Sequence, residues 1–272
     1  MMSDMQLIPL NADVIDAQLA TRSRSALVIQ IYESVGSTND IVRDLHESGS
    51  CRGAAIFAEE QTAGRGRRGR VWHSPTCSNL YCSLGWHFNC SLDALSGLSL
   101  MVGAMLAEAI SQSCGVEVQL KWPNDLYFEE RKLGGVLIES LGEFEGFQVV
   151  VIGIGLNVTM PMPAAAVIDR PWTDLSKASG EVIDRNRLAV TVLDQLVSGL
   201  SDLNASYRDY WFDRWSRRDW LRGRSIVVEG SPPLAGVAAG IDDLGALILH
   251  TETGHCTVAG GEASILEIGA GL

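Results

Sequence analysis

The sequence is poor in lysine and in long apolar runs. Only three of its 21 basic residues are lysines, Lys121, Lys132 and Lys177, and the rest are arginines. Because 33 acidic residues bring the formal net charge to −12, a dedicated nucleic-acid binder, which needs a basic surface, is disfavoured. The longest apolar run, 149–156, is far shorter than the ~20 residues of a membrane-spanning helix. We therefore expect no membrane span.

Targeting and metal-binding signals are also lacking. The first 25 residues contain three aspartates and no apolar stretch behind a basic start, so no signal peptide is predicted and a cytoplasmic protein is expected. The six cysteines form no CxxC pair and are expected to be reduced thiols. His250, His255 and Cys256 lack a second ligand pair at metal spacing. No metal site built from protein clusters is expected.

The composition is that of an ordinary folded protein, with 46% hydrophobic and 20% charged residues in a chain of 272. Residue patterns predict strands at 26–35, 54–58, 80–88, 116–120, 133–141 and 147–158, and helices from Ser37 to about Gly49, at 95–113 and at 185–221. A loop is predicted at 159–184, and short strands at 225–228, 234–241, 246–251, 256–258 and 264–268. These elements predict an N-terminal extension (1–26), a large domain (27–222) and a small β domain (223–272).

The loop from Gly64 to Arg70 is the strongest functional signal. Its four arginines repel one another, so a bound anion is the natural compensation, and a solvated basic turn is the alternative. The loop also satisfies GxGxxG, the dinucleotide-binding fingerprint. We reject that match because Pro75 and a polar stretch follow where the fingerprint requires a helix.

Two further segments combine polar groups with glycines. The segment Lys121-Trp122-Pro123-Asn124-Asp125 and the lysine at 132 flank a predicted turn, and Gly134-Gly135 within a strand indicates close approach by a ligand. The alternative is structural, with Trp122 and Pro123 fixing a corner and Asp125 capping a turn. In 153–158, the alternate glycines leave room on one strand face for a ligand or for a crossing sheet. No P-loop and no GxSxG nucleophile motif is present.

Taken in order, these segments resemble the biotin protein ligases from about residue 27 to the end of the chain. The resemblance rests on Ser37-Thr38-Asn39, Gln61 to Arg70, Lys121 to Asp125, Lys132 to Gly135 and Gly153 to Asn157. It implies an α+β fold, with a mixed sheet and helices like those of class II synthetases and lipoate ligases, followed by a small SH3-like β-barrel. It also implies a two-step reaction, in which ATP and Mg²⁺ convert biotin to biotinyl-AMP and a carrier lysine then takes the biotinyl group.

The resemblance also assigns roles to residues. The implied catalytic residues are Arg67, Lys121, Asp125 and Lys132, with the Mg²⁺ of ATP near Asp125. The implied biotin-binding residues are Ser37, Thr38, Asn39, Gln61, Arg65, Gly66, Arg67, Lys132, Gly134 and Gly135. The implied ATP- or adenylate-binding residues are Arg65, Arg67, Arg70, Trp72, Lys121, Asn124, Asn157 and Trp172.

The implied partner is a biotin carboxyl carrier domain, such as that of acetyl-CoA carboxylase, with a homodimer possible and neither nucleic acid nor membrane expected. Some members of the family carry an N-terminal winged-helix domain that binds DNA. Only about 26 residues precede the first predicted strand, so a short form without repressor activity is expected. The alternatives are a lipoate or octanoate ligase, a non-catalytic biotin-binding regulator, and an RNA-binding module that uses the arginine loop.

Overall fold

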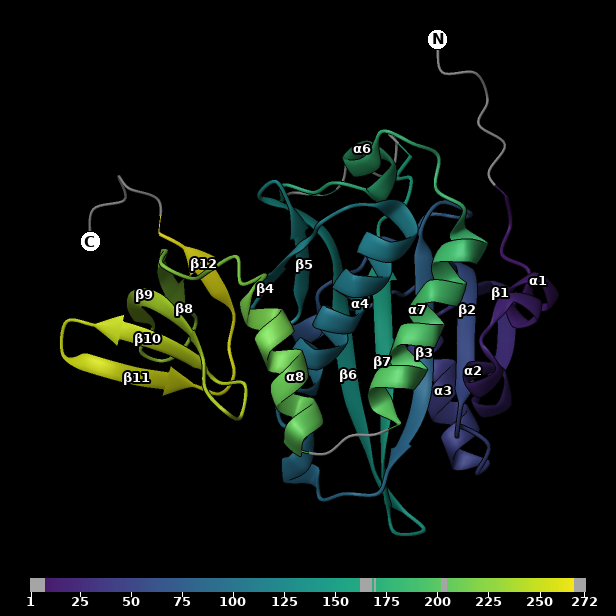
Figure 1. The fold of residues 1–272 in the computed structure, drawn as a ribbon, viewed down its shortest axis with the longest axis horizontal. Helices are drawn as coiled ribbons and strands as arrows, with labels where there is room; N and C mark the ends of the chain where they lie inside the picture. The colour runs from purple at the N-terminus through teal and green to yellow at the C-terminus, as the bar shows by residue number, and fades with distance from the viewer. Residues whose placement is uncertain (1–7, 162–167, 169, 202–204, 267–272) are drawn as a thin grey trace.

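The computed structural model describes residues 8–161, 168, 170–201 and 205–266 of the chain. These residues form a seven-stranded sheet with helices on both faces and, beside it, a five-stranded sheet (Figure 1). The chain is therefore of the α+β class.

The seven-stranded sheet is mixed. Its strands are β1 (Val28–Val35), β2 (Ala54–Gln61), β3 (Leu80–Phe88), β4 (Gln119–Lys121), β5 (Asp125–Phe128), β6 (Arg131–Phe144) and β7 (Phe147–Leu156), in the order β1-β2-β3-β7-β6-β5-β4. Only β1 and β2 pair in parallel, and the other neighbours are antiparallel. A parallel pair needs a crossover connection, and the segment between β1 and β2 supplies it as a helix.

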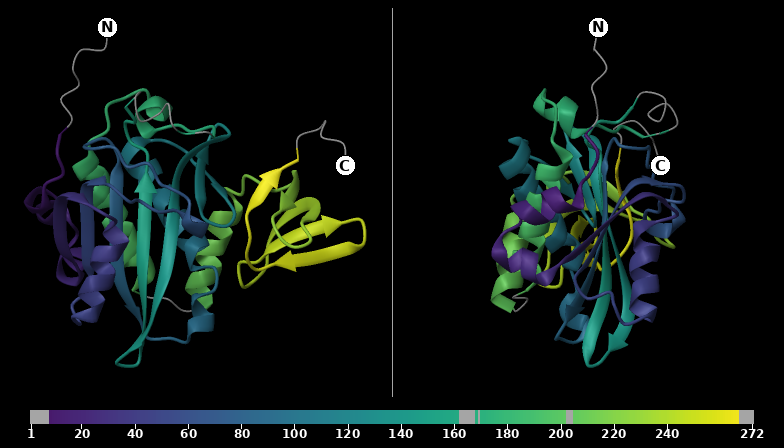
Figure 2. Two further views of the ribbon diagram at one scale, coloured as in Figure 1. Left: turned by 180° about the vertical axis from the view of Figure 1, so that it is seen from behind. Right: turned by 90° about the vertical axis from the view of Figure 1, so that its right-hand side faces the viewer.

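Helices cover the two faces unequally. They are α1 (Ala12–Gln18), α2 (Thr21–Ala26), α3 (Thr38–Glu47), α4 (Leu98–Cys114), α6 (Leu175–Ser179), α7 (Arg185–Leu200) and α8 (Ala205–Ser216), with short 3₁₀ turns η1 (Arg67–Gly69) and η2 (Leu92–Leu95). Helix α3 lies on one face, while α4, α7 and α8 lie on the other (Figures 1 and 2). The segment Leu92–Cys114 is apolar and long enough to cross a membrane by length and composition, but most of it is buried in this layer.

Strand alternation divides the core in two. Leu80, Cys82 and Leu84 of β3 belong to the large cluster on the α4 and α7 side, whereas Val42 of α3 packs in a small cluster on the opposite face. Successive side chains of a strand point to opposite faces, so Ser83 of β3 lies on the α3 side, where it contacts the start of α3. This places a polar group beneath the first turn of that helix.

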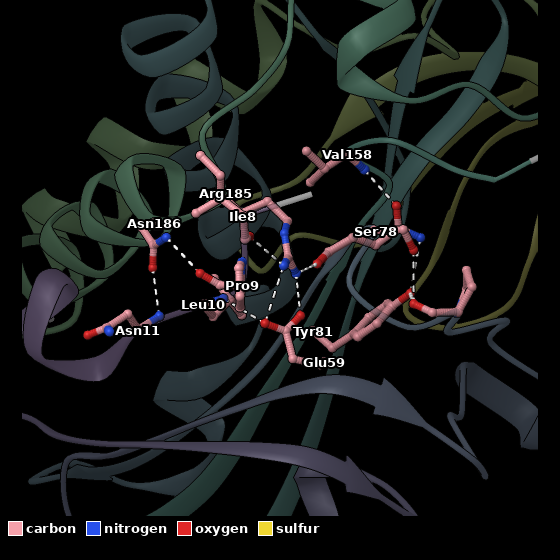
Figure 3. A network of polar contacts seen from close by, with 12 residues as sticks. Ile8, Pro9, Leu10, Asn11, Glu59, Ser78, Tyr81, Val158, Arg185 and Asn186 are labelled. Carbon is pink, nitrogen blue, oxygen red and sulfur yellow. Dashed lines mark hydrogen bonds and ion pairs between the residues drawn. The ribbon is translucent and has the colours of Figure 1, made fainter. Parts of the chain in front are cut away.

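A buried ion pair fixes the N-terminal segment to the fold (Figure 3). Arg185, at the start of α7, donates to Glu59 of β2 at 2.6 Å and to the carbonyl of Ile8 at 2.9 Å. Glu59 also accepts the Leu10 N–H at 2.6 Å. No element is predicted within 1–26, yet α1 and α2 form there because they pack against α7. Residues 1–7 of that extension lie outside the described residues.

The C-terminal sheet comprises β8 (Ser225–Val228), β9 (Leu234–Ile241), β10 (Leu247–Thr251), β11 (Gly254–Val258) and β12 (Ala263–Ile265). Its strands are antiparallel in the order β11-β10-β9-β8-β12. The two sheets meet at Trp122, whose indole donates to the Gly245 carbonyl at 3.1 Å. In addition, the backbone N–H of Trp220 donates to the Leu120 carbonyl at 2.9 Å, so the segment before β8 lies along the edge strand β4.

Two predicted elements differ in kind from the structure, and one strand of the sheet was not predicted. The helix predicted over 185–221 is two helices, α7 and α8, and residues 202–204 between them lie outside the described residues. The loop predicted over 159–184 contains α6, and its residues 162–167 and 169 are outside the described part. Strand β5 was not predicted, because four residues are too few for their alternation to be read as a strand.

Candidate functional site

One pocket gathers almost all of the predicted site residues. It lies where the start of α3, the arginine loop 64–70, the β4–β5 turn and strands β6 and β7 meet. Of the predicted residues, those that line it are Ser37, Thr38, Asn39, Gln61, Arg65, Gly66, Arg67, Arg70, Trp72, Lys121, Asn124, Asp125, Lys132, Gly135, Asn157 and Trp172. Gly134 does not line the pocket. A Cβ at this glycine would lie 2.7 Å from the Gly155 carbonyl oxygen, so it allows close contact with β7 rather than with a ligand.

The polar end of the pocket is built at the start of α3. The Thr38 N–H donates to Gln61 Oε1 at 2.9 Å, and Gln61 Nε2 donates to Ser74 at 3.1 Å. Thr38 and Asn39 both contact the hydroxyl of Ser83. These side chains are buried, apart from the partly exposed Gln61. A small ligand with several polar ring atoms would find partners here.

Three arginines of the loop are held by carboxylates. Arg65 forms a two-pronged pair with Asp40 of α3, at 2.7 and 2.5 Å. The hydrogen bond from Arg65 lowers the pKa of Asp40, so this pair persists into acidic solution. In the same loop, Arg68 pairs with Glu229 and Arg70 with Glu262. Both glutamates belong to the C-terminal part of the chain, so the loop joins the two sheets.

Arg67 differs from its neighbours. Among the residues that the structure describes, no carboxylate forms an ion pair with it, and its polar contact is to Asn124 Oδ1 at 3.5 Å. Burial, followed by the charge of Arg68, lowers the pKa of Arg67. A half-buried guanidinium that lines the pocket without a paired carboxylate is suited to bind an anionic ligand.

Two lysines lie at the cationic end. Lys132 Nζ donates to Asp125 Oδ1 at 2.6 Å across the β5–β6 pairing. Lys121 lies over the Tyr127 ring, with Nζ 5.3 Å from the ring centre, and burial lowers its pKa. These ammonium groups and Arg67 line the same pocket as the Thr38 and Gln61 cluster.

The glycines at 153 and 155, predicted to leave room for a ligand or for a crossing sheet, line the pocket and also make room for side chains of the chain itself. A Cβ at Gly153 would lie 2.4 Å from Asn39 Oδ1, and one at Gly155 would lie 2.6 Å from the Trp72 ring. Glycine therefore lets both side chains lie flat on β7. The indole N–H of Trp72 is buried without a hydrogen-bond partner in the described structure.

The nucleotide-side predictions fall along the pocket wall. Asn157 is buried and its amide donates to the Thr173 carbonyl at 3.0 Å. Trp172 lies beside Lys132 in a short bridge, and Lys177 Nζ lies 4.0 Å from the centre of its ring. Both residues line the pocket, although their polar contacts are to the chain itself.

Sequence reasoning missed several residues of the site. Glu262 and Gly261 reach the pocket from the C-terminal sheet, and Asp40 and Ser83 hold other site residues. Asp40 follows Asn39 directly and carries a charge opposite to that of the arginine loop, a signal that could have found it. No sequence signal marks Glu262, because 192 positions separate it from Arg70.

The chain is similar to known proteins over most of its length. Residues 31–157 match the biotin/lipoate A/B protein ligase family, and residues 223–266 match the biotin protein ligase C terminal domain. The bifunctional ligase/repressor BirA of Escherichia coli is 36% identical over 258 residues, which cover 94% of this chain and 78% of that protein. The biotin--[acetyl-CoA-carboxylase] ligase of Paracoccus denitrificans is 33% identical over 77% of this chain and 89% of its own length.

A solved structure is similar as well. The biotin protein ligase from Aquifex aeolicus, in complex with biotin and ATP, superposes with a TM-score of 0.72 at 27% identity. The match covers 88% of this chain and 98% of that one.

Proposed function

The chain belongs to the biotin protein ligases, and we propose that its pocket activates biotin with ATP before the biotinyl group passes to a lysine of a carrier domain. The enzyme is a biotin--protein ligase. One observation carries the assignment of the site, namely that a buried polar cluster at Thr38 and Gln61 and a cationic cluster at Arg67, Lys121 and Lys132 share one pocket. Biotin has a polar ring at one end and a carboxylate at the other. The polar cluster can hydrogen-bond to the ring, and the cationic cluster can bind the carboxylate.

The first step joins two anions. An oxygen of the biotin carboxylate attacks the α-phosphorus of ATP, a P–O–C mixed anhydride forms, and the bond to pyrophosphate breaks. Cations must offset the repulsion and stabilise the developing negative charge. Arg67, Lys121 and Lys132 supply this positive charge. Arg65 and Gly66 hold the loop over the biotin, while Trp72, Asn124, Asn157 and Trp172 line the nucleotide side together with Arg70.

Lys132 contacts the carboxylate of biotin and then an oxygen of the adenylate. In the free pocket its ammonium is paired with Asp125 at 2.6 Å, which holds Nζ in one place. Gly135 fits this arrangement, because a Cβ there would lie 3.2 Å from Asp125 Oδ1 and 3.6 Å from Lys132 Nζ. Asp125 therefore positions the lysine for both states of the substrate.

A magnesium ion would enter with ATP. Magnesium keeps several waters and binds through one or two carboxylates plus substrate phosphates, so a single carboxylate beside the phosphate site is a sufficient donor. Asp125 offers it, with the amide oxygen of Asn124 nearby in the same turn. When bound, the ion would neutralise phosphate charge.

In the second step the amine of a carrier lysine attacks the carbonyl carbon of biotinyl-AMP, and AMP leaves as the amide bond forms.

We divide the chain into an extension (1–26), a catalytic domain (27–222) and a C-terminal domain (223–272), whose sheet we describe as SH3-like. Glu229 and Glu262 tie that last domain to the arginine loop. Six free cysteines suit a reducing compartment, and we place the activity in the cytoplasm.

Adenylate formation tests the proposal directly. Pyrophosphate release is measured with ATP and Mg²⁺ in the presence of biotin, of lipoate and of neither acid. Release that depends on biotin and not on lipoate is the expected result. Release that depends on lipoate would reassign the substrate, and biotin binding without release would make the chain a non-catalytic biotin-binding protein.

A further inference from the structure

Glu139 of β6 contacts the site without lining it. Asn39 Nδ2 donates to Glu139 Oε2 at 2.5 Å, and Arg43 donates to Glu139 Oε1 at 3.1 Å. Asn39 lines the pocket, whereas Glu139 lies behind it on the α3 side of the sheet. The glycine at 153 leaves space for the Asn39 amide between the two. Because a carboxylate only accepts hydrogen bonds, Asn39 must turn its NH₂ group towards Glu139 and its oxygen towards Ser83.

This orientation of Asn39 determines the direction in which the hydroxyls of Ser83 and Thr38 donate their protons. Ser83 Oγ lies 2.5 Å from Asn39 Oδ1 and 2.6 Å from Thr38 Oγ1. Each of these short contacts needs a proton, and the amide oxygen has none. Ser83 therefore donates to Asn39, and the remaining contact must use the proton of Thr38. The Thr38 hydroxyl then has no proton left for any other partner.

Two acceptors are left facing each other as a result. Gln61 Oε1 lies 3.1 Å from Thr38 Oγ1, and its orientation is fixed by the Thr38 N–H at 2.9 Å. With the Thr38 proton turned towards Ser83, both oxygens present lone pairs at the polar end of the pocket. An N–H of a ligand placed between them would satisfy both.

We propose that Glu139 is a positioning residue that sets the hydrogen-bond polarity of the pocket, through Asn39 and Ser83, so that Thr38 and Gln61 accept an N–H group of the substrate. This inference rests on the proposed function, since the substrate group that fits is an N–H of the cyclic urea of biotin. It assigns a role in substrate selection to a carboxylate outside the pocket.

The substitution Glu139→Gln tests the polarity because it keeps the shape. Arg43 has only donors, so it takes the amide oxygen of the new side chain and leaves the NH₂ group facing Asn39. Asn39 must then flip, Ser83 donates to Thr38, and Thr38 donates to Gln61. The ligand N–H loses its acceptors, and biotin binding weakens about tenfold, the effect of one hydrogen bond.

A second substitution restores the polarity. In Arg43→Met/Glu139→Gln the cation is gone, so the glutamine turns its oxygen to Asn39 and the original chain of hydrogen bonds returns. We expect biotin affinity within about twofold of that of Arg43→Met alone, whereas two independent lesions would add. Glu143→Gln, on the same strand and paired with Gln148 at 3.4 Å, is the matched control.

Titration calorimetry with biotin, at fixed pH, gives the affinities of the unsubstituted protein and of the four variants, and thermal unfolding confirms that each variant is folded. Weak binding by Glu139→Gln together with recovery in the double variant supports the proposal. Unchanged binding by Glu139→Gln, or a double variant as weak as or weaker than Glu139→Gln, overturns it. Failure of the unsubstituted protein to bind biotin would contradict the proposed function instead, so the two failures are distinguishable.

Discussion

Lys132 Nζ lies 2.6 Å from Asp125 Oδ1, and each side chain is only 14% exposed. The pair spans β5 and β6 next to the irregularity in their pairing between Leu126 and Tyr127. This contact fixes the position of the Lys132 ammonium inside the pocket before any substrate arrives. The cation is therefore in place when biotin and ATP bring their negative charges together.

Lys132→Ala is expected to lower the rate of biotin-dependent pyrophosphate release by about 10²–10³-fold, the usual effect of removing one group that stabilises transition-state charge. Arg131→Ala, at the adjacent exposed position, is the control and leaves the rate unchanged. Circular dichroism checks that both variants are folded. A folded Lys132→Ala protein with a near-normal rate would remove Lys132 from the catalytic set.

Gly155→Ala is expected to destabilise the fold by about 1–3 kcal/mol through overpacking and to slow adenylate formation. The added methyl would lie 2.6 Å from the Trp72 ring and push the indole into the pocket. Gly260→Ala, with no atom within 4 Å of the added Cβ, should behave like the unsubstituted protein. Urea unfolding and pyrophosphate release measure the two effects, and unchanged values for Gly155→Ala would contradict this packing.

Arg185→Leu is expected to lower the free energy of unfolding by about 3–5 kcal/mol, because it leaves Glu59 buried and unpaired. The side chains of the pair are only 4% and 8% exposed. By contrast, Arg217→Leu breaks an exposed pair with Asp213 and should cost less than about 1 kcal/mol. Urea unfolding at neutral pH compares them, and equal losses would show that the network in Figure 3 does not anchor the N-terminal segment.

The stability of the fold should depend on Asp219 as the pH changes. Burial raises the pKa of Asp219 from 3.8 to about 6, so between these values the folded state holds a proton that the unfolded state has released. The contribution of this carboxyl to stability therefore falls as the pH rises through that window. Relative to the unsubstituted protein, Asp219→Asn should gain stability from pH 4 to pH 7. A constant difference in the free energy of unfolding would contradict this.

Much of the fold was predictable from local pattern. The strand predictions at 80–88, 225–228 and 234–241 coincide with β3, β8 and β9, because each alternates or runs apolar between clear turn residues. The sheet order was not predictable, since pairing of β3 with β7 depends on contacts between residues about 70 positions apart. Helices α1 and α2 also escaped prediction, because packing against α7 rather than local pattern holds them.

More of the pocket than of the fold could be predicted from the sequence. Polar and glycine-rich segments marked Arg67 and Lys132, the resemblance to the biotin protein ligases added Thr38, and the structure brings the three into one pocket. Apart from Asp125, the carboxylates that hold these segments were missed. Glu139 lies in a strand where a single glutamate has no special pattern, and Glu262 belongs to a different sheet. Such partners become visible only when distant segments are placed side by side.

Transfer of biotin to a carrier is the most direct test of the central claim. The full-length protein is incubated with a biotin carboxyl carrier domain, ATP, Mg²⁺ and biotin, and the carrier is analysed by intact-mass and peptide mass spectrometry. We expect a gain of one biotinyl group on a single lysine, dependent on ATP and lost with Lys132→Ala. A carrier of unchanged mass, in the presence of an enzyme that is folded and binds biotin, would contradict it.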